Sequence, residues 1–521
     1  MPDPVRPPLS KGRWKLAPQA VIDADQLQHG LQRLVVEAAF SSAATVLTSG
    51  VILTAYALML GATNFQIGLL ASAPFLCQLL QLPAVPMIER LRARKAISVL
   101  TSVVGRAMLA VMGLAIWVPD GGAVAILIAA QFVLCSMSAI GSCAWNAWLR
   151  DLVPPNRLGA IIARRTGWAS VIALIAGVVA AVALDEGRGP DGWQRQVFGV
   201  IYIAGCIAGL VSAAIVARVP EPQMPPPGAT PARLLHRLRV PFRDANFRAL
   251  LRFLASWQFA INLATPFFTV FLVRQLGYNM TFVMLLSVVS QLANLAVLRL
   301  WGTLSDRFAH KSVLSLAAPA YILAIAGMIA ASQFSSTEWR TAYLVLLHIV
   351  MGIAVAGVTL ATASISLKLS PSEDAPAYVA SAATATAIAA GIAPILGGAF
   401  ADFFADRALI MQIVWTAPGE MLSVAPIRLA EWEFYFAVSA LIGLYAMHRL
   451  TAVREEGEID RQEMLAQFVH QTRRSARNLS TVAGLRAMTE LPAGLIRGLR
   501  QSAASRGPDR ADRARSPAPE P

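Results

Sequence analysis

Amide, imidazole and indole side chains recur inside long apolar runs of this sequence, and the chemistry that they offer is hydrogen bonding. A polar group surrounded by hydrocarbon must find a partner, so each is expected to face protein or water and not lipid. Candidates for contact with a bound solute are Gln78, Asn146, Trp257, Gln258, Asn262, Gln291, Asn294 and His348. Gln131 offers a further amide. Hydrogen bonding between helices is the alternative role for each amide, and a satisfied core position is the alternative for His348.

Charged side chains are scarce in the same runs, and Arg106 is the exception that needs a reason. An arginine at this depth could attract an anionic solute, pair with Glu37 or another acid, or extend to the nearer interface. The structural ion pair is the favoured interpretation. Glu37, Asp185 and Asp402 all fall near the ends of runs, so no carboxylate is expected at mid-depth. Proton coupling is therefore not established, although His348 could titrate near neutrality.

The elements that carry these residues must be membrane-spanning helices. Hydrophobic residues make up 56% and charged residues 14% of the 521, and the mean hydropathy is +0.57. This composition excludes an ordinary soluble domain. A helix needs about 20 apolar residues to cross the hydrocarbon, and about twelve such runs are present. They begin near Ala38, Phe65, Ala96, Ala123, Thr166, Val197, Phe247, Thr281, Ser312, Thr341, Ala377 and Glu433. The fold class is therefore all-α and polytopic.

An internal repeat divides the twelve helices into two halves of six. The segments Gly61–Lys95 and Gly277–Lys311 match at an offset of 216, and each runs from a Leu-Gly pair through an apolar span into a charged turn. The expected domains are a cytoplasmic segment 1–36, a first half 37–217, a cytoplasmic linker 218–246, a second half 247–450 and an Arg-rich, partly disordered tail 451–521.

The distribution of Lys and Arg predicts the orientation. The first and third loops, 62–64 and 119–122, contain neither residue, whereas the segment before the first span and the second and fourth loops are rich in them. Both termini are therefore expected on the cytoplasmic side of an inner or plasma membrane. The net charge of +14 follows from this topology and from the tail, which we expect to bind anionic lipids rather than nucleic acid.

The charged turns resemble those of the major facilitator superfamily, which carries a Gly-x-x-x-Asp-Arg-x-x-x-Arg/Lys element after the second helix of each half. Gly302, Asp306, Arg307 and Lys311 fit it, while the first copy departs, with Pro86 near the position of the Gly, Glu89 in place of Asp and extra arginines. The resemblance implies two halves that rock about a midplane cavity.

The resemblance also gives the turns a role as a cytoplasmic gate, formed by Glu89, Arg90, Asp306, Arg307 and Lys311. Each carboxylate would cap a helix of the opposite half, because a negative charge is favoured at a helix N-terminus. Asp306 would face the fifth helix near Arg164 and Arg165, and Glu89 the eleventh near Tyr378.

The function implied is secondary active or facilitative transport of a small organic solute, with uptake and export both open. In such a cavity, Trp257, Gln258, Asn262, Gln291 and Asn294 could hold a neutral or zwitterionic solute or a flat amphipathic compound. No enzymatic activity, metal or cofactor is expected, because neither metal-ligand nor catalytic spacing is present, and a monomer is expected. The alternative is a membrane sensor or assembly factor that kept the fold and lost transport.

Overall fold

The computed structural model describes residues 17–19, 22–119, 122–188, 192–224, 240–371, 374–405, 407–417, 420–429, 431–459 and 461–480. The first sixteen residues, most of the predicted linker and the tail beyond residue 480 lie outside this set. The chain forms two compact units, residues 1–458 and 459–521. The described part of the second unit is one helix, α16 (Arg461–Ser480), within the predicted Arg-rich tail.

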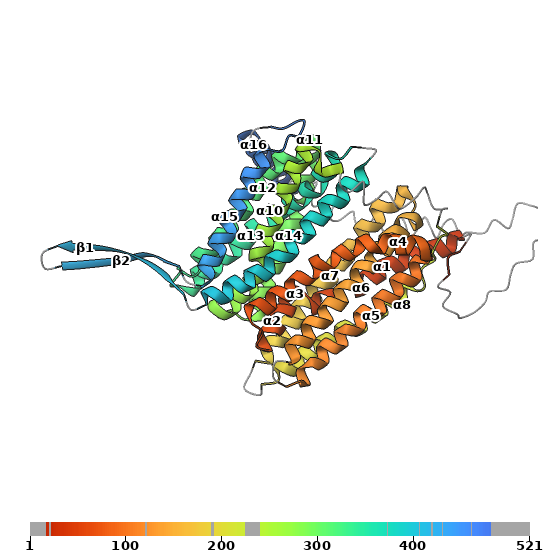
Figure 1. The fold of residues 1–521 in the computed structure, drawn as a ribbon, viewed down its shortest axis with the longest axis horizontal. Helices are drawn as coiled ribbons and strands as arrows, with labels where there is room; N and C mark the ends of the chain where they lie inside the picture. The colour runs from red at the N-terminus through yellow and green to blue at the C-terminus, as the bar shows by residue number, and fades with distance from the viewer. Residues whose placement is uncertain are drawn as a thin grey trace, which may run out of the picture. The chain divides into compact units, whose positions relative to one another are not determined.

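The larger unit contains two helical halves, coloured red to yellow and green to blue in Figure 1. The first half consists of α1 (Ala24–Thr48), α2 (Gly50–Met59), α3 (Asn64–Cys77), η1 (Gln78–Leu80), α4 (Gln81–Leu91), α5 (Arg94–Leu114), η2 (Ala115–Trp117), α6 (Gly122–Leu152), α7 (Pro155–Glu186) and α8 (Gln194–Val216). The second consists of η4 (Val240–Phe242), α10 (Ala245–Val270), the π-helical η5 (Phe271–Gln275), α11 (Met280–Arg307), α12 (His310–Ala331), α13 (Thr337–Lys368), α14 (Ala375–Phe404) and α15 (Glu431–Thr451).

The polytopic all-α prediction is confirmed. Among the described residues, ten helices are long and apolar enough to cross a membrane, and the pair α3 and α4, bent by 43°, brings the number to as many as eleven. Pro83, near the bend, cannot donate a hydrogen bond to the preceding turn, which weakens the helix there. The 21-residue α15 stands in the twelfth place and packs against α10 and α12.

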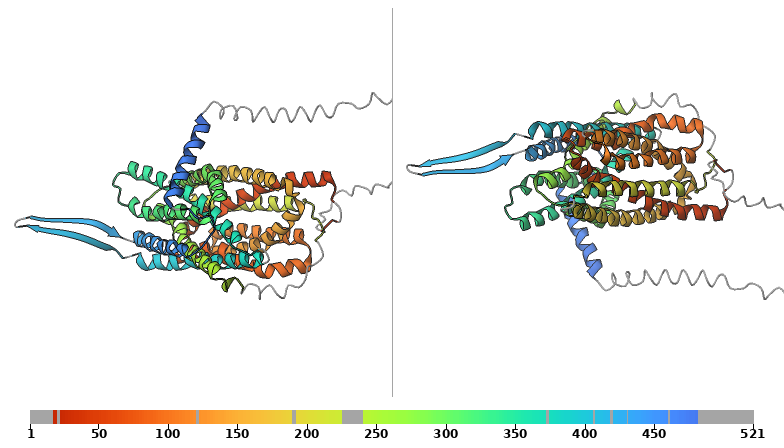
Figure 2. Two further views of the ribbon diagram at one scale, coloured as in Figure 1. Left: turned by 90° about the horizontal axis from the view of Figure 1, so that it is seen from above. Right: turned by 90° about the horizontal axis from the view of Figure 1, so that it is seen from below.

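Strands β1 (Leu409–Ala417) and β2 (Glu420–Leu429) pair as an antiparallel ribbon between α14 and α15. Figure 2 shows this ribbon extending away from the helices. It adds a small β element to the segment that joins the last two spans. Residues such as Ile, Val, Trp and Thr in β1 favour extended backbone, in agreement with this pairing.

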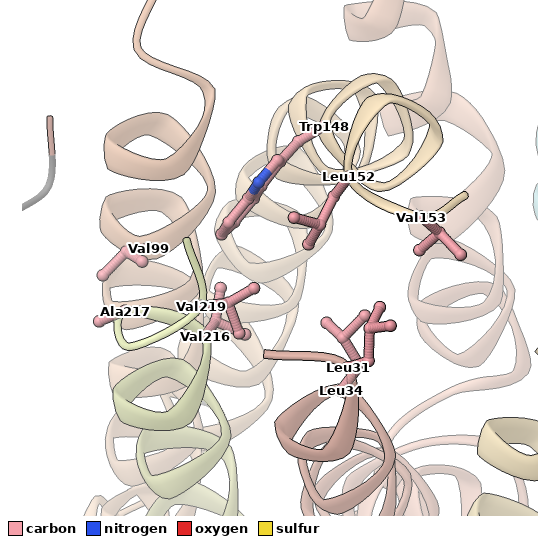
Figure 3. Packing of buried hydrophobic residues seen from close by; sticks show 9 residues of the cluster. All are labelled: Leu31, Leu34, Val99, Trp148, Leu152, Val153, Val216, Ala217 and Val219. Carbon is pink, nitrogen blue, oxygen red and sulfur yellow. The ribbon is translucent and has the colours of Figure 1, made fainter. Parts of the chain in front are cut away.

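The first half has a compact apolar cluster near the Arg-rich turns. Leu34, Trp148 and Val219 are fully buried there and come from α1, α6 and the segment after α8 (Figure 3). The indole Nε1 of Trp148 donates to the carbonyl oxygen of Pro220 at 3.0 Å. This bond satisfies the one polar atom of the buried ring and fixes the chain that leaves α8.

Both halves cap their third helix with a buried carboxylate from the segment that follows their sixth helix. Glu221 accepts a hydrogen bond from the backbone N–H of Arg94 at 2.9 Å, where α5 begins. Glu455 accepts from the N–H groups of His310 and Lys311 at 3.1 and 2.7 Å, where α12 begins. Burial raises the pKa of the Glu221 carboxyl, and the bonds from the start of α5 oppose that shift. The matching caps repeat the internal symmetry at the level of hydrogen bonds.

Candidate functional site

Two carboxylates join the halves at the end of the bundle opposite the Arg-rich turns. Asp185, at the end of α7, accepts from the backbone N–H groups of Met280 and Thr281 at 2.8 and 2.6 Å, at the start of α11. Asp402, at the end of α14, accepts from Asn64 and its neighbour Phe65 at 3.0 and 2.9 Å, at the start of α3. Each carboxylate therefore caps a helix of the other half, and we call the two contacts the aspartate ties.

Glycines bring the backbones of α3 and α14 together beside one tie. A Cβ added at Gly68 would overlap the carbonyl oxygen of Pro394, and one added at Gly398 would overlap that of Asn64. The equivalent contact between α7 and α11 is looser, because Gly177 meets the flexible side chain of Met284 at 3.2 Å. The halves are thus sealed at this end by one tight and one looser helix pair.

At the Arg-rich end the halves separate, as Figure 1 shows for the ends of α4 and α11. Asp306, Arg307, Glu89 and Arg90 are exposed there. Lys311 instead binds within its own half, with its Nζ 2.9 Å from a carboxylate oxygen of Glu458. The proposed partners of the gate are also engaged elsewhere. Arg165 pairs with Glu37 at 3.0 Å, and the Tyr378 ring packs edge-on against Phe247. The gate belongs to a state that is closed at this end, so it stays a prediction.

A cavity of about 470 Å³ lies between the halves. Its polar lining comes from both halves and comprises Ser49, Thr54, Gln131, Asn262, Thr265, Thr269, Ser287, Ser290, Gln291, Tyr321 and His348. The lining contains no Asp, Glu, Lys or Arg among the residues that the structure describes. This cavity therefore offers hydrogen bonds and apolar surface without a formal charge.

Three of the eight predicted contact residues line this cavity: Asn262, Gln291 and His348. Nδ1 of His348 lies 2.8 Å from the carbonyl oxygen of Leu344. A carbonyl oxygen can only accept, so Nδ1 carries the hydrogen, and Nε2 of the neutral ring is an acceptor. The Asn262 Nδ2 group donates within α10, to the carbonyl oxygen of Gln258 at 2.8 Å.

The other five predicted residues lie outside the cavity lining. Gln78 and Asn146 are exposed elsewhere on the first half, and Asn294 is half-buried on α11. Trp257 is buried against Phe253 and Tyr321 in the core of the second half. Gln258 accepts from Asn262 and so supports the lining from behind. Gln258 lies on the same face of α10 as Asn262, one turn away, whereas Asn146 lies 15 residues along α6 from the lining residue Gln131.

Two residues of the cavity lining need separate description: Tyr321, which the sequence analysis did not name, and Gln131, which it did. Tyr321 comes from α12, and its hydroxyl lies 3.2 Å from Thr265 Oγ1. Gln131 is 3% exposed, and its Oε1 has no hydrogen-bond partner among the described residues. A buried amide oxygen without a partner costs free energy, so it marks a place where a solute donor would be favoured.

The first span is broken where it meets the cavity. Ser49 is extended and Gly50 has a φ of 58°, so α1 ends and α2 begins at mid-membrane depth. The Ser49 side chain does not cap α2, and its hydroxyl bonds back to the carbonyl oxygen of Thr45 at 2.6 Å. Free backbone N–H groups at the start of a helix are tolerated in a membrane where they line a cavity.

Arg106 lies in a second, polar pocket inside the first half. Its Nη2 donates to Ser41 Oγ at 3.2 Å. Glu37, expected near the end of its span, is buried and lies within α1, which begins as early as Ala24. Glu37 binds Arg165 and accepts from Ser212 Oγ at 3.1 Å. Arg165 therefore forms the direct ion pair with Glu37, and the Glu37 charge also acts on Arg106 over a longer distance.

The family model of the Major Facilitator Superfamily matches residues 38–362 and 259–493, and the chain belongs to this superfamily of membrane transporters. No curated protein sequence matches the chain significantly. Its fold is similar to solved structures of the family. The crystal structure of the nucleoside transporter NupG superposes with a TM-score of 0.60 at 14% identity, covering 81% of this chain and 98% of that one. The D-xylose–proton symporter gives 0.58 at 14% identity, with 83% and 99% covered.

A bacterial homologue of the human lysosomal transporter Spinster, in its inward-facing and unoccupied conformation, gives a TM-score of 0.54 at 16% identity. It covers 86% of this chain and is itself covered over 95% of its length. These likenesses establish the fold, and the residues of each cavity must be considered for each chain separately.

Proposed function

We propose that the protein moves a small organic solute across a membrane by alternating access, without enzymatic chemistry. The observation that carries the proposal is the cavity shared by both halves, which the reciprocal aspartate ties join at one end while their helix ends separate at the other. A cavity between halves that are joined at one end by a few breakable contacts is what a rocking transporter requires.

The central cavity favours an uncharged, hydrogen-bonding part of the solute. Its lining offers acceptors at Gln131 and His348 and amides at Asn262 and Gln291, with no formal charge among the described residues. Two of the similar structures are a nucleoside transporter and a xylose symporter, whose names describe neutral polar solutes. Neutral sugars and nucleosides are therefore the first solutes to test.

We place the Arg-rich end in the cytoplasm of a cell whose inner or plasma membrane holds the protein, with both termini inside. The support is the concentration of Lys and Arg in the turns at this end. In this orientation the structure is an inward-facing state. The same charges, with those of the tail, would attract anionic lipids of the inner leaflet. A single chain contains both halves and the cavity between them, which supports a monomer.

The test is uptake of radiolabelled glucose, xylose, uridine and adenosine into proteoliposomes that contain the purified full-length protein. Saturable uptake that is lost in Asn262→Ala supports transport through the central cavity. The matched control is Asn246→Ala, outside the cavity, where the amide bonds Arg454 at the end of the second half.

The sensor or assembly-factor alternative predicts a different pattern. A solute that raises the unfolding temperature of the protein but is never taken up into proteoliposomes would favour it over transport, because a ligand stabilises any folded state that binds it.

A further inference from the structure

We propose that the polar pocket around Arg106 binds an anionic group, a carboxylate or phosphate, of the transported solute. This inference rests on the proposed transport function and names a chemical feature of its solute. The pocket has a volume of about 180 Å³ and lies inside the first half, between α1, α5, α6 and α7.

The charges in this pocket do not balance. Its lining includes two arginines, Arg106 and Arg165, and one carboxylate, Glu37. Glu37 is engaged by Arg165 and Ser212, and no carboxylate of the described residues lies within ion-pair distance of Arg106. Arg106 therefore shares the single charge of Glu37 with Arg165. One positive charge is left uncompensated, which is costly inside a membrane, so the pocket favours one further negative charge.

The other groups of the pocket suit an anion. Hydroxyl groups surround it, from Ser41, Ser98, Thr101, Ser102, Ser138 and Ser142. Arg165 lies with its guanidinium carbon 5.5 Å from the centre of the Trp145 ring, and its Nε is buried without a hydrogen-bond partner among the described residues. The hydroxyls of Ser98, Thr101 and Ser142 already donate to backbone carbonyl oxygens. The two guanidinium groups and the other three hydroxyls remain as donors around one small space, and such donors are the recognition chemistry of carboxylates and phosphates.

The fold holds Arg106 in position. Arg106 stands about 18 Å along α5 from its first residue, at the usual rise of a helix. Its aliphatic stem passes over Gly209 of α8, where an added Cβ would lie 2.5 Å from Cδ and 2.7 Å from Cγ. Only a glycine leaves room for the stem, which directs the guanidinium towards Ser41. The arrangement is a positioned cation and not an arginine that extends to the interface.

The pocket is placed to act together with the central cavity. Ser41 and Ser49, which line the pocket and the cavity respectively, are eight residues apart on the same helical stretch, which corresponds to about 12 Å. Gln131 and Ser138 of α6 are related in the same way, at about 10 Å. A solute with an uncharged hydrogen-bonding body and an anionic group about 10 Å away would therefore match both sites.

The experiment measures binding of ³²P-labelled inorganic phosphate to the purified full-length protein in nanodiscs of phosphatidylcholine at 0.15 M salt. We expect saturable binding in the wild type, displaced by benzoate and not by its neutral analogue benzamide. Arg106→Gln should weaken binding at least tenfold, and Arg106→Lys should weaken it less. Arg150→Gln, which removes a positive charge from a side chain that is 79% exposed, should leave it unchanged.

A second variant tests the position of the charge without removing it. Gly209→Ala should displace the Arg106 stem and weaken phosphate binding several-fold, whereas Gly167→Ala, where an added Cβ meets no atom within 4 Å, should not. Wild-type protein without saturable binding, equal displacement by benzamide, or unchanged affinity in Arg106→Gln would each overturn the proposal.

A lipid headgroup carries the same phosphate chemistry as a free solute. Nanodiscs of phosphatidylglycerol distinguish the two, because a pocket filled by lipid would lose its affinity for inorganic phosphate there, which would overturn the solute assignment. Uptake of neutral solutes is measured independently of phosphate binding, so the two proposals can fail separately. Phosphate binding that fails while a neutral solute is taken up saturably would reject the anion site and leave the transport function standing.

Discussion

A substitution at Gln131 should affect the stability of the fold and the affinity for solute in different ways. Its Oε1 is buried in the cavity wall without a partner, at a desolvation cost of about 1–3 kcal/mol. Gln131→Met keeps the approximate size of the side chain and removes the unpaired acceptor, together with a weak bond from Nε2 to Cys135 Sγ at 3.5 Å. We expect an unfolding temperature that is unchanged or higher, together with about a tenfold loss of solute affinity, the equivalent of one hydrogen bond. Thermal unfolding and uptake measured on the same preparation check both effects.

Gln275→Met is the matched control for this prediction. Gln275 donates from Nε2 to a carboxylate oxygen of Glu433 at 3.0 Å, outside the cavity. The same chemical change there removes a satisfied bond to a buried acid, so the unfolding temperature should fall and the solute affinity should not change. A fall in stability in both variants would show that Gln131 is a structural residue.

At the scale of elements, the helix pair α3 and α14 is the rigid contact between the halves. Gly398→Ala would place a methyl group against the carbonyl oxygen of Asn64, so the pair must separate to accept it. We expect the variant to shift the protein towards a state open at the end held by the aspartate ties. Labelled maleimide reacting with a single cysteine introduced at Ala62, 1% exposed here, would report that opening as faster labelling.

Gly167→Ala, within α7, provides the control, because an added Cβ at Gly167 meets no atom within 4 Å. An alanine in a helix is favoured over glycine by about 1 kcal/mol, so this variant should be at least as stable as the wild type and show unchanged labelling. Equal labelling of the two variants would mean that α3 and α14 move apart without resistance from their backbone contact.

The sequence predicts elements better than it predicts which elements meet. Apolar runs of spanning length and the 216-residue repeat are local or regular signals, and they sufficed for the helices and the two halves. Asp185 and Asp402 are also recognisable as repeat partners, yet no local pattern states that they cap helices 95 and 338 residues away. Tyr321 lines the cavity from α12, a helix on which the sequence analysis named no candidate residue. The residues at the start of α1 are polar and form no apolar run, so the sequence did not predict that this helix begins as early as Ala24.

At the scale of the whole molecule, the two aspartate ties lower the free energy of the state that is closed at the tied end relative to the state that is open there. They exist only while the halves are closed at one end, so they stabilise this state over its alternative. Asp185 is half-buried, with a side chain 17% exposed, whereas Asp402 is exposed. A carboxylate at a helix N-terminus contributes about 0.3–1 kcal/mol when exposed and up to about 2 kcal/mol when partly buried. The tie made by Asp185 should therefore be the stronger of the two.

The different strengths of the two ties predict different shifts in the populations of the two states. Asp185→Asn should shift the equilibrium towards the state open at the tied end by about tenfold, and Asp402→Asn by several-fold. The double variant should shift it by about the product of the two factors, because the ties lie on different helix pairs and are independent. Pulsed electron–electron double resonance measures the distance between spin labels at Gly61 and Ala405, in a variant without the four native cysteines, and so reports the populations of the two states. Glu186→Gln is the control, since this neighbouring exposed acid makes no bond to the other half among the described residues. Distances that stay unimodal in all variants would show that the halves do not exchange between states, and a fold that cannot alternate cannot transport.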